Sequence, residues 1–175
     1  MHKFNPDKLK KLDDPERLSL FDPEAVLKSF GLKPGMTVLD VGTGAGFYLP
    51  YLSKMVSDSG KVYAIDISPE AVEYAKSKVS QLGLKNVEVL LSQENKIPLP
   101  NNTVDFTYMA FVFHELEDPV KFLKELERVS KPISYLAFID WKKEERDKGT
   151  PPDRVGRVVE VGPYVYGFYA MFVKQ

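Results

Sequence analysis

Three glycines alternate with other residues in the run Gly42-Thr43-Gly44-Ala45-Gly46, and Asp40 stands two residues before it. Glycine has no Cβ, so this run can turn sharply and let a bound molecule lie directly against the backbone. A tight turn by itself needs only one such residue. Three glycines beside an acid therefore favour a nucleotide-like ligand over a purely structural turn.

The residues around the glycines indicate which nucleotide is bound. The dinucleotide fingerprint G-x-G-x-x-G requires a glycine where Phe47 stands. A carboxylate at Asp40 would also repel a pyrophosphate, whereas it would attract a cation. S-adenosylmethionine carries a sulfonium and an ammonium group and no phosphate, so the sequence favours this cofactor over NAD.

A second acid, Asp66, follows 20 residues after Gly46 at the end of another apolar run. An acid at this place can accept hydrogen bonds from both ribose hydroxyls of an adenosine and would repel a 2′-phosphate. The alternative is an aspartate that caps the next helix. Ser68 is better placed for that cap, which favours the ligand role for Asp66.

Strands alternate with helices along most of the chain. Expected strands cover 36–41, 61–66, 87–91, 104–110 and 133–139, and expected helices cover 22–30, 47–56, 69–82 and 119–130. This order predicts an α/β fold of Rossmann-like, doubly wound type with a mostly parallel sheet. Ligands of such sheets lie beyond the carboxyl ends of the strands, where Asp40 and Asp66 are expected.

The run from Val38 to Gly46 resembles the glycine motif of class I S-adenosylmethionine-dependent methyltransferases. The resemblance extends over roughly residues 4–173 and is closest to the ubiquinone/menaquinone-biosynthesis type. It implies that the acid and the glycine turn hold the methionine part of the cofactor, while Ile67 packs on the adenine and Gln93, where the family usually has Asp, accepts from its amino group. The implied cofactor-binding residues are Asp40, Gly42, Thr43, Gly44, Gly46, Asp66, Ile67, Gln93, Glu94 (through its backbone N–H) and Ala110.

The same resemblance implies a catalytic candidate. In the family, the segment matching 108–116 lies beside the sulfonium, and His114 matches a histidine often found there. This imidazole can orient an acceptor or take its proton. The alternative is a histidine with a structural hydrogen bond, because methyl transfer needs mainly in-line approach in a dry pocket.

The ends of the chain carry further expectations. Residues 1–30 are expected to form a lid or cap of a single domain spanning 1–175, with Phe4, Leu12 and Phe21 as candidate lid contacts. Residues 155–161 and 166–173 are expected to pair as antiparallel strands, which gives the sheet an antiparallel C-terminal strand. Family members normally have a helix after strand five, but residues 141–156 lack an apolar stripe. Either the sheet ends differently here or residues are missing between Pro152 and Val158.

Composition limits the function classes. The formal net charge is −1, from 24 basic and 25 acidic side chains, so nothing favours a nucleic acid or an anionic membrane as partner. The absence of cysteine excludes disulfides and thiolate metal sites, and no metal is expected. No apolar run is long enough for membrane insertion, so the protein is expected to be cytoplasmic.

The sequence thus predicts an enzyme that transfers a methyl group from S-adenosylmethionine to an unidentified small-molecule acceptor. Two alternatives stay open: a non-catalytic module that binds adenosine or S-adenosylmethionine, and an NAD-dependent oxidoreductase, against which Asp40 and Phe47 argue.

Overall fold

The computed structural model describes Leu9 and residues 11–15, 22–141, 158–161 and 164–171. The chain divides into two compact units, His2–Gln93 and Glu94–Gln175, here named the N-terminal unit and the C-terminal unit. Each unit alternates strands with helices, which confirms the predicted α/β, Rossmann-like class.

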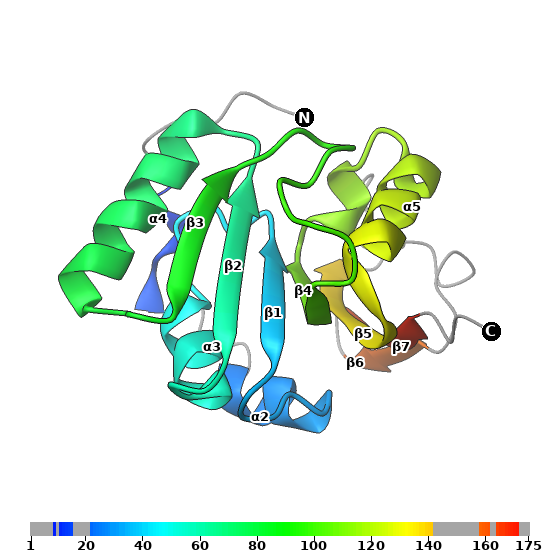
Figure 1. Ribbon diagram of the computed structural model, residues 1–175, viewed down its shortest axis with the longest axis horizontal. Coiled ribbons are helices and arrows are strands. Elements are labelled where there is room, and N and C mark those ends of the chain that lie inside the picture. Colours follow the sequence, from blue (N-terminus) through cyan, green and yellow to red (C-terminus); the bar gives the residue numbers. More distant parts are fainter. Residues whose placement is uncertain (1–8, 10, 16–21, 142–157, 162–163, 172–175) are drawn as a thin grey trace. The chain divides into compact units, whose positions relative to one another are not determined.

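Three parallel strands form the sheet of the N-terminal unit, in the order β3-β2-β1 (Figure 1). Their bounds are β1 (Thr37–Val41), β2 (Lys61–Asp66) and β3 (Val87–Leu91), and the helices are α2 (Pro23–Ser29), α3 (Leu49–Val56) and α4 (Pro69–Leu82). Both crossovers, through α3 and α4, step in the same direction along the sheet. Right-handed connections then place both helices on one face of it.

Side-chain caps fix where the helices of this unit begin. Asp22 accepts hydrogen bonds from the backbone N–H groups of Glu24 and Ala25 at the start of α2. Ser68 accepts from the N–H of Ala71 at the start of α4. A proline in each first turn has no N–H to satisfy, so both starts follow the sequence prediction.

The C-terminal unit contains a four-stranded sheet in the order β4-β5-β7-β6. Its elements are β4 (Val104–Ala110), the 3₁₀ turn η2 (Phe113–Glu115), α5 (Pro119–Val129), β5 (Ser130–Trp141), β6 (Val158–Val161) and β7 (Tyr164–Met171). Strands β4 and β5 are parallel, while β7 runs antiparallel to both β5 and β6. Residues 142–157, which hold the expected break after strand five, lie outside the described residues.

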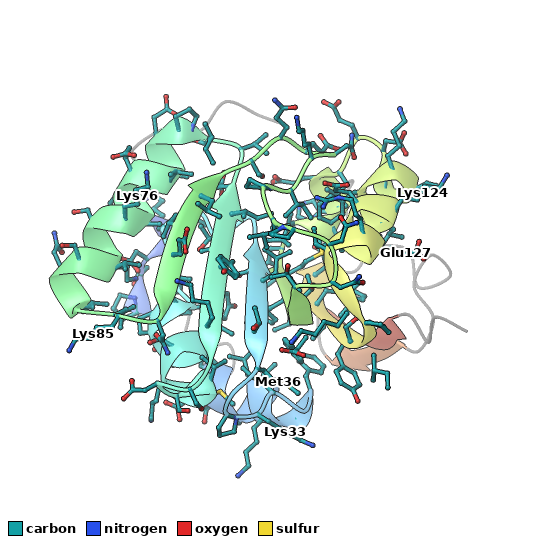
Figure 2. All side chains as sticks on the ribbon, in the orientation of Figure 1. Lys33, Met36, Lys76, Lys85, Lys124 and Glu127 are labelled. Carbon is teal, nitrogen blue, oxygen red and sulfur yellow. The ribbon has the colours of Figure 1, made fainter. Side chains whose placement is uncertain are left out.

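Most side chains on both faces of β1 and of β4 are buried. Positions 38–41 of β1 are all buried, and in β4 Phe106, Tyr108 and Met109 are fully buried. Charged side chains instead extend outward from the helices, as Lys76 on α4 and Lys124 on α5 show in Figure 2. Near-continuous burial along a strand is typical of a parallel sheet that is covered on both sides. No helix of the described residues is long and apolar enough to cross a bilayer.

Gly60 lies just before β2, at a close approach between the end of α3 and the chain before β1. An added Cβ would lie 2.5 Å from the Cβ of Val56 and 2.7 Å from the carbonyl oxygens of Met36 and Val56. These atoms cannot swing aside, so we expect Gly60→Ala to lower the free energy of unfolding by about 2–3 kcal/mol in urea denaturation.

Gly83→Ala is the matched control for that prediction. Gly83 ends α4 with φ +64°, and nothing lies within 4 Å of an added Cβ. The free energy of unfolding of Gly83→Ala should therefore fall by only about 1 kcal/mol, the cost of a left-handed conformation for a residue with a Cβ. Equal losses in the two variants would show that the close approach at Gly60 has no energetic weight.

Candidate active site

The alternating glycines of the turn after β1 are explained by their backbone conformation. Gly42, Gly44 and Gly46 have φ values of +65°, +53° and +71°. This left-handed region is rarely adopted by residues with a Cβ. The N–H of Gly46 donates to the carbonyl of Thr43 at 2.8 Å. The N–H of Thr43 donates to the carbonyl of Ile65 at 3.0 Å, which fixes the turn against β2. Each glycine is thus required by the turn itself, whether or not a ligand lies against it.

Asp66 joins the glycine turn to the start of α4. It is the last residue of β2 and is 7% exposed. One carboxylate oxygen accepts from the N–H of Gly44 at 2.9 Å, and the other accepts from the N–H of Ser68 at 2.9 Å. Burial raises the pKa of Asp66, and these backbone hydrogen bonds oppose the rise. A carboxylate has about four acceptor sites, so lone pairs remain for further donors.

Asp40 is a buried acid close to the same turn. It is 2% exposed, and its Oδ2 has no hydrogen-bond partner among the described residues. Its pKa is raised to about 7, chiefly by burial; the nearby hydroxyl of Thr43 opposes the rise and the charge of Asp66 adds to it. A buried carboxylate oxygen without a donor is costly, and a cationic group would relieve that cost. The turn is therefore suited to a positively charged ligand.

Part of the N-terminal segment packs on this turn. Leu9 is buried in a cluster with Ala45 and Ala71, and Leu12 packs against that cluster. The side chain of Leu12 would lie 3.4 Å from a Cβ placed on Gly44. Next to it, the carboxylate of Asp13 accepts from Lys78 and Tyr74 of α4. The other two candidate lid residues, Phe4 and Phe21, lie outside the described residues.

The remaining predicted cofactor residues divide between the two units. Ile67 follows Asp66 and is half-buried, while Gln93 is exposed at the end of the N-terminal unit. Glu94 and Ala110 belong to the C-terminal unit, and both are half-buried. The side chain of Glu94 accepts from the N–H of Glu117 at 2.8 Å. The structure thus unites only the residues of the glycine turn with Asp40 and Asp66, and the other assignments stay predictions.

His114, the catalytic candidate, is held by an acid that sequence reasoning missed. Its Nδ1 lies 2.6 Å from Oδ1 of Asp140, and its backbone N–H donates to Oδ2 of the same carboxylate at 2.9 Å. Asp140 lies near the end of β5 and is 0% exposed, whereas the side chain of His114 is 10% exposed. The signal was present in the sequence: an acid close to the end of an apolar strand that runs parallel to the strand before His114.

The backbone beside His114 takes an unusual conformation. Phe111 leaves β4 with φ +59°, and its N–H donates to the carbonyl of Ile139 at 2.7 Å. Phe113 is buried and stacks on Phe138 with 5.9 Å between ring centroids. An aromatic residue in the left-handed region is strained, and such strain gathers at functional sites. These contacts fix the short turn that carries His114.

Comparison with known proteins identifies relatives. The family described as "Methyltransferase domain" matches residues 32–154. A demethylmenaquinone methyltransferase from Bacillus mycoides (strain KBAB4) is 34% identical over 106 residues, covering 61% of this chain and 45% of the relative. The ubiquinone/menaquinone biosynthesis C-methyltransferase UbiE from Enterobacter sp. (strain 638) is 32% identical over 114 residues, covering 65% and 45%. The chain therefore spans about half the length of the curated relatives it matches.

A solved structure agrees over nearly the whole chain. The crystal structure of a SAM-dependent methyltransferase from Aquifex aeolicus is 69% identical, with a TM-score of 0.86, and the match covers 96% of this chain and 98% of that one. Because the match covers nearly all of both chains, the two proteins are of similar length.

The burial of Asp40 predicts a pH-dependent gain of stability in Asp40→Asn without ligand. The pKa of Asp40 is about 7 in the folded protein and 3.8 as its ordinary value. The folded state therefore holds this proton more tightly, so ionisation removes stability as the pH rises from about 4 to about 7. Asparagine avoids that loss, and the variant should gain about 2–4 kcal/mol over the unsubstituted protein above pH 7 and little near pH 4.

Urea denaturation over that pH range measures the effect. Asp58→Asn is the control, because it removes the charge of an exposed aspartate before β2 and leaves the buried Asp40 in place. If both variants show the same pH dependence, the gain does not come from the buried carboxylate.

Proposed function

Because the chain belongs to the methyltransferase-domain family, within the class I S-adenosylmethionine-dependent enzymes, we propose that it transfers a methyl group from S-adenosylmethionine to a small-molecule acceptor. Membership confirms the class and the cofactor inferred from the sequence. The observation that carries the proposal is the pair of buried acids, Asp40 and Asp66, at a glycine turn that suits a cation.

The proposed cofactor contacts follow from the chemistry of each group. Asp66 would accept from the ribose hydroxyls with the lone pairs that its two backbone donors leave. Asp40 would balance the positive charge of the methionine part, which would lie against the turn from Gly42 to Gly46. Exposed Gln93 carries a carboxamide that can accept from the adenine amino group. Ile67 and the backbone of Glu94 would contact the adenine ring, and Ala110 would lie near the sulfonium.

The acceptor is proposed to be a small molecule with an apolar part. Two curated relatives are named for methylation in menaquinone or ubiquinone biosynthesis, and those names describe the relatives. In this chain, Val112 and Phe113 are buried, so of the three apolar residues after β4 only Phe111 is partly exposed. Phe111 is thus the better candidate for acceptor contact. The formal net charge of −1 supports a small molecule rather than a nucleic acid.

Two further parts of the architecture are proposed. Strand β5 pairs with β7 from Ser134–Met171 to Trp141–Tyr164, which supports a mostly parallel, doubly wound sheet with an antiparallel C-terminal strand. A single domain over residues 1–175 stays a prediction. Leu9 and Leu12, which pack beside the glycine turn, support a lid formed by residues 1–30.

Asp66→Ala is expected to lower the affinity for S-adenosylmethionine by at least about 100-fold, measured by isothermal titration calorimetry. The substitution removes an acceptor for two ribose hydroxyls, and each charge-assisted hydrogen bond contributes about 1.5–3 kcal/mol. It also removes two acceptors of backbone N–H groups, so the variant should be less stable.

Asp22→Ala is the matched control. It too removes a carboxylate that accepts from two backbone N–H groups, at the start of α2. It should lose about 1 kcal/mol of stability and keep the affinity for the cofactor. If the two variants bind S-adenosylmethionine equally well, Asp66 is not a ribose ligand.

Thermal-shift measurements test the identity of the cofactor. S-adenosylmethionine and S-adenosylhomocysteine should each raise the melting temperature, because a ligand that binds only the folded state stabilises it. NAD should leave the melting temperature unchanged, since its pyrophosphate would meet Asp40. A shift with NAD alone would contradict the proposal and restore the oxidoreductase alternative.

A further inference from the structure

The carboxylate of Asp140 meets His114 at two places. Its Oδ2 accepts the backbone N–H of His114, and its Oδ1 lies 2.6 Å from the ring Nδ1. Asp140 is 0% exposed, so both groups help to compensate a buried charge. A carboxylate only accepts hydrogen bonds, so the short contact requires a proton on Nδ1.

We propose that Asp140 is a positioning residue that fixes His114 as the tautomer with its proton on Nδ1 and its lone pair on Nε2, ready to take a proton from the methyl acceptor. This inference rests on the proposed function. It limits the acceptor to a compound that loses a proton when it is methylated. The methylated atom either carries that proton, as in a hydroxyl or a protonated amine, or becomes nucleophilic when the proton leaves. A tertiary amine or a thioether would need no such base.

In the proposed step, a hydroxyl acceptor loses its proton and gains the methyl group. Nε2 of His114 takes the hydroxyl proton, and an electron pair on that oxygen forms the new bond to the methyl carbon. The bond between carbon and sulfur breaks, and its electrons stay on sulfur, which leaves S-adenosylhomocysteine. The resulting imidazolium is stabilised by Asp140 and later returns its proton to water.

Glu115 is a second acid near the ring of His114. The carboxylate of Glu115, on the same 3₁₀ turn, lies 3.8 Å from Nε2, which is beyond hydrogen-bond distance. The carboxylate of Asp140 on β5 is closer by more than an ångström and is fully buried, whereas the side chain of Glu115 is 48% exposed and screened by solvent. Of these two acids, Asp140 therefore determines which nitrogen holds the proton.

The substitution Asp140→Asn makes a sharp test because it keeps the shape and reverses the hydrogen bonding. The backbone N–H of His114 can only donate, so it takes the carbonyl oxygen of the introduced amide. The amide NH₂ then faces Nδ1, which must accept from it. The ring proton should move to Nε2, and the lone pair that takes the acceptor's proton is lost from that atom.

Nitrogen NMR of the ¹⁵N-labelled full chain reads the tautomer directly. The chain has two histidines, and His2 serves as a reference within the molecule, with His2→Gln to assign its signals. In alkaline buffer, we expect the proton of His114 on Nδ1 in the unsubstituted chain and on Nε2 in Asp140→Asn. Signals of His2 should be the same in both.

Two outcomes would overturn the inference. One is a proton on Nε2 in the unsubstituted chain, a measurement that requires no variant and so does not depend on whether Asp140→Asn folds. The other is a proton that stays on Nδ1 in a folded Asp140→Asn. Calorimetry with S-adenosylmethionine on the unsubstituted chain separates this inference from the proposed function. If the chain does not bind S-adenosylmethionine, the methyltransferase function is refuted, while the tautomer measured for His114 still stands.

Discussion

The glycine turn depends on the hydrogen bond from the N–H of Gly44 to the carboxylate of Asp66. This bond joins the end of β1 to the end of β2, and the second oxygen of the same carboxylate holds the start of α4 at Ser68. A single buried side chain thus fixes a strand end, a turn with three left-handed residues and a helix start. Those three elements surround the groups proposed to bind the cofactor.

The same arrangement places two acids in low-dielectric surroundings. Burial raises the pKa of Asp40 and of Asp66, and the charge of Asp66 adds to the rise at Asp40. Asp66 is compensated by backbone donors, whereas Oδ2 of Asp40 has no partner among the described residues. Folding therefore tolerates a destabilising charge that a cationic ligand can neutralise, which is a common compromise between stability and function.

Local chemistry explains what the sequence could predict. The caps Asp22 and Ser68, each followed by a proline, mark helix starts within a few residues, and the alternating glycines match three left-handed φ values. The early start of β5 at Ser130 was not predicted, because no turn residue separates it from α5. Asp140 was missed for a different reason: its partner lies 26 residues earlier, and only the register of β4 with β5 reveals the pairing.

The two bonds that Asp140 makes to one residue have an evolutionary consequence. A backbone N–H persists under any substitution at position 114 except proline, but the donor on the ring does not. Losing the imidazole would remove one donor from a fully buried carboxylate, at a cost of about 1–3 kcal/mol. Lineages that dispense with the histidine should then replace the aspartate as well, so the two positions are expected to covary among homologues.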